Sequence, residues 1–241
     1  MNETNTQANQ NDRTGISRRR FLGVTGTIVL VAGSQCRLAD AAVKSTEGTK
    51  FPPSDGYILV DTRKCQGCVS CMLACSLVHE GVESQSLSRI QIIQDAFKGF
   101  PNDLTIAQCR QCVDPKCMKE CPTDALIVDR ANGNVRRVDA KKCIGCGTCF
   151  DKCPHTPSRS IEAPDKRYKN KDKARKCDLC AAAPYHWDKA GGGPDGKQAC
   201  VAVCPVGAIK FTRTIPDQNG DKGYDVNLRK RSWARLGYPT D

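Results

Sequence analysis

Residues 63–75 read RKCQGCVSCMLAC and place four cysteines at positions 65, 68, 71 and 75. The spacing is C-x2-C-x2-C-x3-C, which lets three thiolates from one loop and a fourth from just beyond it bind iron–sulfur clusters. A single run of this kind is weak evidence. The prediction therefore depends on whether the pattern recurs.

The pattern recurs three times further along the chain. Sixteen of the seventeen cysteines fall into four groups: Cys65, Cys68, Cys71 and Cys75; Cys109, Cys112, Cys117 and Cys121; Cys143, Cys146, Cys149 and Cys153; and Cys177, Cys180, Cys200 and Cys204. The stretch VDTRKCQGCVSC from Val60 matches VDAKKCIGCGTC from Val138, and CMKECPTDAL from Cys117 matches CVAVCPVGAI from Cys200. The groups alternate between two types, which indicates a duplicated module.

The second and third groups resemble one unit of a two-cluster bacterial ferredoxin. Residues 109–153 contain a Cys-Pro, the apolar stretch DALIVD, the turn RANGN and the stretch VRRVDAKKC before the next cysteines. The first and fourth groups each lack one half of such a unit, so we expect the strand at 209–211 to pair with YILVD at 57–61. The predicted fold class is α+β: two fused bacterial-ferredoxin-like units, one inserted into the other, loop-rich, with short antiparallel hairpins and short helices.

The same resemblance implies which cysteines share a cluster, because in two-cluster units the fourth cysteine of each run binds the other cluster. The implied ligand sets for four [4Fe–4S] clusters are Cys65, Cys68, Cys71 with Cys204; Cys177, Cys180, Cys200 with Cys75; Cys109, Cys112, Cys117 with Cys153; and Cys143, Cys146, Cys149 with Cys121. A rival arrangement pairs the first group with the second and the third with the fourth. It would place Cys75 with Cys109, Cys112 and Cys117.

Composition is compatible with a chain organised around clusters. Only 39% of the residues are hydrophobic and 5% are aromatic, so bound clusters would supply the organising centres that apolar packing supplies elsewhere. Residues 1–41 hold five basic and three acidic side chains, which leaves +9 of the formal +11 for the remainder. Four clusters with their thiolates would lower this remainder to about +1. The basic excess is therefore a counter-charge, and no nucleic-acid partner is expected.

Other metal or sulfur chemistry fits the pattern less well. Zinc sites usually offer two cysteine pairs separated by a spacer, and dense disulfide frameworks belong to much shorter secreted chains. A three-iron cluster at one of the sites is a minor variant. The three histidines, His79, His155 and His186, have no spaced partner outside the cysteine runs and are expected to be ordinary surface or packing residues.

The N-terminus predicts an export signal. SRRRFLG at 17–23 is similar to the twin-arginine pattern S-R-R-x-F-L, and FLGVTGTIVLVAG at 21–33 is too short to cross a bilayer comfortably. LADA at 38–41 provides a cleavage site after Ala41. The alternatives are an uncleaved membrane anchor and a disordered basic tail. Cys36 lies in no convincing lipidation motif, and the predicted location is the periplasm, with membrane association through a partner.

Residues 57–211, with all sixteen cysteines, resemble the four-cluster iron–sulfur subunits of the dimethyl sulfoxide reductase type. The resemblance implies an electron-transfer subunit without catalytic residues of its own. Its partner would be a large catalytic oxidoreductase subunit with a molybdenum or tungsten pterin, and its second partner a membrane quinone-reactive subunit, a cytochrome or a soluble redox protein. CQGCVSCMLACSLVHEG and SLSRIQII are also similar to the partners of aldehyde oxidoreductase-type tungsten enzymes. The alternatives are a free-standing polyferredoxin and the iron–sulfur subunit of a hydrogenase or nitrite reductase system.

The predicted organisation follows from these motifs. The segments are 1–41, the signal peptide; 42–56, a linker; 57–108, the first half of the split unit, with an inserted hairpin made by RIQIIQ and LTIAQ; 109–154, the inserted unit; 155–176, a basic linker; 177–212, the second half of the split unit; and 213–241, a C-terminal docking tail. The tail mixes Trp233 and Tyr238 with Arg and Lys, a combination typical of interfaces.

Overall fold

The computed structural model describes residues 51–155, 157–158 and 160–238. The predicted export signal and Cys36 lie outside these residues. Within the described part of the chain, no helix is long and apolar enough to cross a membrane. The elements are short helices and two-stranded antiparallel sheets, as the α+β prediction requires.

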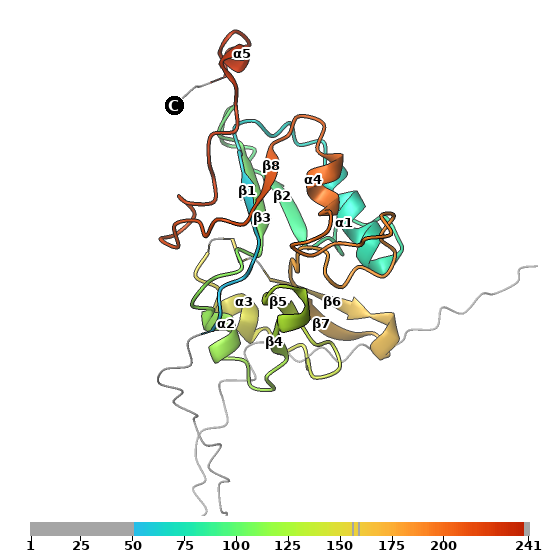
Figure 1. Ribbon diagram of the computed structural model, residues 1–241. Coiled ribbons are helices and arrows are strands. Elements are labelled where there is room, and N and C mark those ends of the chain that lie inside the picture. Colours follow the sequence, from blue (N-terminus) through green and yellow to red (C-terminus); the bar gives the residue numbers. More distant parts are fainter. Residues whose placement is uncertain (1–50, 156, 159, 239–241) are drawn as a thin grey trace, which may run out of the picture. The chain divides into compact units, whose positions relative to one another are not determined.

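One sheet joins the two ends of the cysteine-containing region. Strand β1 (Tyr57–Val60) pairs with β8 (Ile209–Thr212), with Tyr57 opposite Thr212 and Val60 opposite Ile209. This confirms the strand pairing expected from the sequence. Helix α1 (Ser70–Glu80) packs against α4 (Ala199–Val203) near this sheet (Figure 1).

A second set of elements repeats this arrangement. Strand β4 (Leu126–Asp129) and β5 (Val135–Val138) form the predicted hairpin, connected by a short 3-10 helix, η2 (Arg130–Asn132). Helix α2 (Lys116–Lys119) contacts α3 (Thr148–Asp151). The hydrophobic core here is small and includes four of the cysteines, so packing alone buries little apolar surface.

The predicted insertion before Cys109 is also a hairpin. Strand β2 (Ile90–Gln94) pairs with β3 (Leu104–Gln108), and Ile90 and Ile106 from this hairpin join the same core as Ile58 and Val60. The hairpin therefore extends the core around β1 rather than forming a separate unit.

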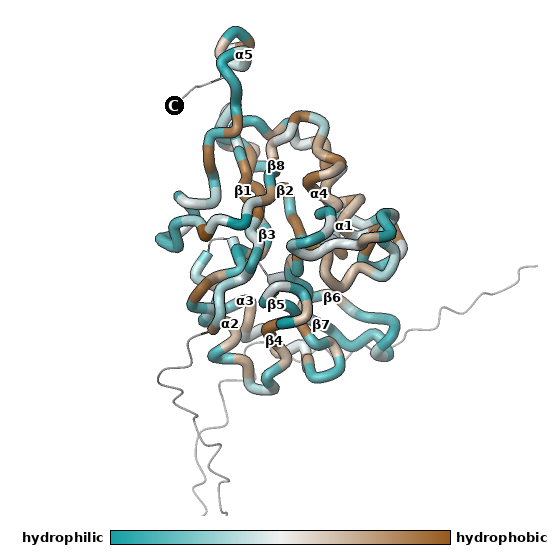
Figure 2. The backbone as a smooth tube through the Cα atoms, in the orientation of Figure 1, coloured by the Kyte–Doolittle hydropathy of each residue, from teal (hydrophilic) through white to brown (hydrophobic). Residues whose placement is uncertain are grey.

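The region 155–176 differs from the linker that the sequence predicts. It contains a regular hairpin of β6 (Ile161–Asp165) and β7 (Lys171–Arg175), joined by η3 (Lys166–Tyr168). Figure 2 shows this hairpin as mostly hydrophilic. The buried side chains of Asp165 and Arg175 are satisfied by ion pairs, so the strands lack the hydrophobic alternation by which strands are recognised.

The C-terminal tail folds back onto the rest of the chain before it reaches α5 (Arg231–Ala234). The Asp61 carboxylate accepts hydrogen bonds from the Leu228 amide, at 2.8 Å, and from Nε of Arg229, at 3.0 Å. Tyr224 is buried as well. At least the first half of the predicted docking tail is therefore held by its own chain.

Candidate iron–sulfur sites

The sixteen cysteines gather at four places, which we call sites 1 to 4. Site 1 is a small cavity lined by Cys65, Cys68, Cys71 and Cys204. Site 2 is a small cavity lined by Cys75, Cys177, Cys180 and Cys200. Site 4 is a small cavity lined by Cys121, Cys143, Cys146 and Cys149.

Site 3 consists of Cys109, Cys112, Cys117 and Cys153. Burial and the charge of Cys109, together with those of Cys117 and Cys153, raise the pKa of Cys112 to about 12, so these four thiols lie close to one another. Cys109 and Cys117 are buried, and Cys112 and Cys153 are half-buried. The groups that the sequence predicts as ligand sets are therefore also groups in space.

Matching loops position the thiols of sites 1 and 4. In both C-x-G-C loops the glycine has a positive φ, 67° at Gly67 and 69° at Gly145, a conformation that side chains disfavour. A Cβ on Gly145 would also collide with the carbonyl oxygen of Asp172 in β7. Glycine is required there for close packing as well as for the turn.

Helices connect the sites in pairs. Cys71 of site 1 and Cys75 of site 2 are four residues apart on α1, which places them on one helix face. Cys200 of site 2 lies in α4, and Cys204 of site 1 follows it directly. Helix α2 likewise contains Cys117 of site 3 and is followed by Cys121 of site 4. Helix α3 contains Cys149 of site 4 and is followed by Cys153 of site 3.

Backbone amides point toward several of the sulfurs. Amide donors to sulfur are Gly67 to Cys65 at 3.5 Å, Arg89 to Cys75 at 3.3 Å, Ala174 to Cys143 at 3.4 Å and Ala208 to Cys204 at 3.2 Å. Such hydrogen bonds are a normal feature of iron–sulfur ligation and influence the reduction potential.

At sites 1, 2 and 4, four thiols line one cavity. Four cysteine ligands match a [4Fe–4S] cluster, which has one iron atom for each sulfur ligand. The residues therefore fit [4Fe–4S] clusters at the four sites.

Comparison with known proteins supports this interpretation. A family model described as a 4Fe-4S dicluster domain matches residues 102–214. The thiosulfate reductase electron transfer subunit PhsB of Salmonella typhi is 36% identical over 165 residues, which cover 65% of this chain and 76% of that protein. The chain belongs to the 4Fe-4S dicluster family of iron–sulfur electron-transfer subunits.

This chain covers different shares of two further relatives. The polyferredoxin-like subunit of an aliphatic sulfonate oxidoreductase from Pyrococcus furiosus is 40% identical over 128 residues, 53% of this chain and 67% of that one. The beta subunit of an NADH-dependent phenylglyoxylate dehydrogenase from Aromatoleum evansii is 37% identical over 169 residues, 68% of this chain. The match covers only 32% of that longer protein.

A buried ion-pair group adjoins site 2. Nε2 of His79 lies 2.9 Å from Asp178, and Nη1 of Arg89 lies 2.6 Å from the same carboxylate. Burial lowers the pKa of His79, but Asp178 outweighs this effect and raises it to about 9. On its other side the His79 ring lies 3.7 Å from the Cys75 sulfur.

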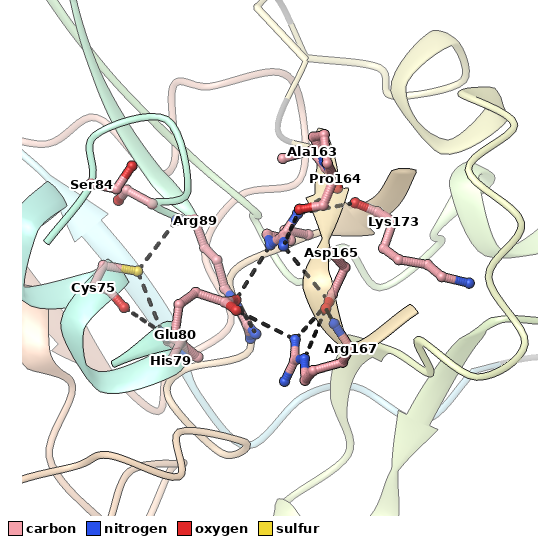
Figure 3. A network of polar contacts seen from close by, with 12 residues as sticks. Cys75, His79, Glu80, Ser84, Arg89, Ala163, Pro164, Asp165, Arg167 and Lys173 are labelled. Carbon is pink, nitrogen blue, oxygen red and sulfur yellow. Dashed lines mark hydrogen bonds and ion pairs between the residues drawn. The ribbon is translucent and has the colours of Figure 1, made fainter. Parts of the chain in front are cut away.

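The same group continues to the β6–β7 hairpin through Glu80, as Figure 3 shows. The Glu80 carboxylate lies 3.3 Å from both Arg167 and Arg175, and these two arginines also pair with Asp165. Helix α1, which carries cysteines of sites 1 and 2, is thereby fixed to a hairpin that packs on site 4. The β6–β7 hairpin therefore has a structural role, in contrast to the linker that the sequence predicts for residues 155–176.

Several residues around the thiols are not indicated by any sequence pattern. The sequence predicts His79 and His155 to be ordinary surface or packing residues, but both contact cysteines, His155 with Nε2 at 3.5 Å from the Cys112 sulfur. Their partners are distant in sequence, so spacing could not reveal them. Lys176 was assigned to a basic linker, yet it is 5% exposed and its Nζ lies 3.0 Å from the Cys117 sulfur. Its place directly before Cys177 was the one available signal.

Proposed function

We propose that sites 1 to 4 each hold one [4Fe–4S] cluster and that the chain conducts electrons between a catalytic subunit and a second redox partner. The gathering of sixteen cysteines into four groups of four carries the proposal. When bound, such clusters supply one-electron redox chemistry over a wide range of potentials. The chain contributes the thiolates, the amide donors, the shielding from water and the relative placement of the sites.

The contacts support a linear order from site 1 to site 4. Sites 1 and 2 share α1, and sites 3 and 4 share α2 and α3. Lys176 connects sites 2 and 3. Its Nζ contacts the Cys117 sulfur of site 3, and the next residue in the chain is Cys177 of site 2. The buried Gln111 side chain also donates to the Cys177 carbonyl oxygen at 2.7 Å. In this order the first group completes its unit with the fourth, and the second with the third.

Exposure supports partner docking at the two ends of this order. Cys68 in site 1 and Cys146 in site 4 are the exposed cysteines of the described chain, and both belong to terminal sites. Beside Cys146, the side chains of Ile144 and Phe150 are 63% and 50% exposed. An apolar rim around an exposed ligand suits a protein partner. The middle sites have no exposed cysteine and are reached through the terminal ones.

We further infer that the catalytic partner is of the molybdenum or tungsten pterin type, on the basis of the resemblance to dimethyl sulfoxide reductase subunits. Purification of the native protein without a tag tests this. We expect co-elution with a large subunit that contains a pterin and one of these metals. Elution as a redox-active monomer would instead support the free-standing polyferredoxin, and a large subunit without a pterin would support the hydrogenase or nitrite reductase alternative.

The proposed location is the periplasm, reached by twin-arginine export after the clusters have been inserted. The expectation depends on Arg18 and Arg19 in SRRRFLG. Changing both residues to Lys should leave the protein in the cytoplasm with its clusters intact, whereas Arg13→Lys should not affect delivery. Cell fractionation followed by immunoblotting distinguishes these results. Unchanged delivery of the double variant would contradict the proposed signal.

A further inference from the structure

We propose that site 3 gives its cluster the most positive reduction potential of the four, because Lys176 and Arg136 place two buried, uncompensated positive charges beside it. The inference rests on the proposed binding of clusters at the four sites. Positive charge near a cluster stabilises the more negative, reduced state, so the reduction potential rises. The argument requires that the two charges are buried, close to site 3 and not neutralised.

Lys176 meets these requirements directly. It follows β7 in the chain, its side chain is buried, and its Nζ lies 3.0 Å from the sulfur of Cys117. Within the described residues, Lys176 forms no ion pair with an Asp or Glu.

Arg136 provides the second charge from strand β5. The residue is 1% exposed, and its Nη1 donates to the carbonyl oxygen of Asn134 at 2.6 Å. Its Nε and Nη2 atoms are buried without a partner in the protein. The thiols of Cys109 and Cys112 are close enough to influence the pKa of the guanidinium, which burial lowers from a very high value.

The two unpartnered nitrogens of Arg136 are a separate indication of an acceptor at site 3. Buried donors in folded proteins almost always have a hydrogen-bond partner. Sulfur atoms of a bound cluster are acceptors, and no carboxylate pairs with Arg136 within the described residues. The Arg136 guanidinium therefore has two donors available for the group that the site 3 cysteines would hold.

At the other sites, nearby cations either pair with carboxylates or donate to backbone carbonyl oxygens. At site 2, the positive charges of His79 and Arg89 are offset by Asp178 and Glu80. At site 1, Lys64 donates to the carbonyl oxygens of Gly207 and Leu228 at 3.2 and 3.1 Å.

Sites 1 and 4 also have a carboxylate nearby. At site 4, Lys173 donates to the carbonyl oxygen of Cys143 rather than to a sulfur. Asp103 is close enough to raise the pKa of Cys65 in site 1, after the larger effects of burial and the other thiols. In site 4, burial raises the pKa of Cys149, the Ser160 hydrogen bond and the charge of Lys176 lower it, and Glu162 raises it by less than these. Site 3 has Asp221 nearby, because His155 lies 3.5 Å from the Cys112 sulfur and 3.3 Å from that carboxylate. Asp221 pairs with Arg110, however, and not with Lys176 or Arg136.

The consequence concerns where an electron resides in the subunit. Because site 3 lies between sites 2 and 4, a chain reduced by one electron would hold that electron in the interior, away from the exposed terminal sites. Lys176 and Arg136 thus act as positioning residues for the electron. The side chains themselves undergo no chemical change.

The test is an anaerobic potentiometric titration of the full holoprotein with dithionite, followed by electron paramagnetic resonance. Wild type is compared with Lys176→Met and Arg136→Gln. The matched control is Lys173→Met. Lys173 is also a buried lysine, in β7, but it donates to a carbonyl oxygen at site 4 and not to a site 3 sulfur. In Lys176→Met we expect the most positive midpoint potential to fall by at least about 59 mV, a tenfold lower ratio of reduced to oxidised cluster at fixed ambient potential. Arg136→Gln should shift the same midpoint downward, and Lys176→Arg should largely preserve it.

A Cys112→Ser variant identifies the signal of site 3, which should be the most positive one in wild type. The inference is overturned if the most positive signal survives Cys112→Ser unchanged. It is also overturned if the Lys176→Met and Arg136→Gln proteins retain four clusters with the wild-type midpoint at site 3. Fewer than four clusters in wild-type protein would contradict the proposed function instead, before any potential is compared.

Discussion

Asp178 is expected to be critical for retaining the cluster at site 2. Its side chain is 1% exposed and accepts from four donors: the His79 ring at 2.9 Å, the Arg89 guanidinium at 2.6 Å and the amides of Cys180 and Ala182 at 3.1 and 3.3 Å. These contacts connect α1 to the loop that carries Cys177 and Cys180. Replacing Asp178 with Asn keeps the size and one acceptor oxygen but removes the negative charge.

The expected magnitude follows from leaving buried positive charge without its partner. Removing one member of a buried ion pair costs about 3–5 kcal/mol. Because Asn retains part of the hydrogen bonding and Arg89 keeps Glu80 as a second partner, we expect about 3 kcal/mol, the lower end of that range. At about 1.4 kcal/mol for each factor of ten, this corresponds to roughly 100-fold faster loss of the native state.

The assay is the rate of bleaching of the anaerobic holoprotein in a fixed concentration of urea, since cluster loss is irreversible and stability is then a rate. Asp188→Asn is the matched control. Asp188 pairs with Lys197, a 69% exposed side chain, and such an exposed ion pair contributes little to stability. The Asp178→Asn protein should bleach roughly 100-fold faster, with site 2 the first to be lost. Equal rates for the two variants would refute the structural role of the buried charge.

Two further predictions concern individual sites. Cys75→Ser should disturb the cluster at site 2 and Cys121→Ser the one at site 4, since serine is a poorer iron ligand than thiolate; an altered spin-resonance signal from a cluster outside the same unit would contradict the proposed order. Gly145→Ala should lose or loosen the cluster at site 4, because its methyl group would meet the Asp172 carbonyl oxygen. Gly191→Ala, at a similar φ of 68° but with no atom within 4 Å, should retain all clusters, and equal cluster contents in the two variants would show that the contact with Asp172 does not matter.

Cysteine spacing and repeated flanking sequence were sufficient to predict the α+β class and the pairing of β1 with β8. They were informative because cluster ligation requires fixed local spacing and because the chain repeats that spacing with the same flanking residues. The hairpins that contain apolar runs, such as Ile90–Gln94, were predictable for a different reason: period-two alternation is visible in a sequence.

The surroundings of the sites could not be predicted in this way. Asp178 and His79 lie 99 positions apart, and Lys176 lies 59 positions from Cys117, so no local pattern links them. The β6–β7 hairpin was missed because Asp165 and Arg175 are buried as an ion pair, which looks like a solvated charged segment in a sequence. Charged side chains that are distant in sequence and pair only in the folded protein can be recognised as partners only from the structure.

The central claim is that the chain holds four [4Fe–4S] clusters, and the most direct measurement is the iron, acid-labile sulfide and zinc content of anaerobically purified protein. Four complete sites predict about sixteen iron and about sixteen sulfide per chain, with negligible zinc. A protein with stoichiometric zinc and little iron, or with iron and sulfide sufficient for only two clusters after anaerobic reconstitution, would contradict the account.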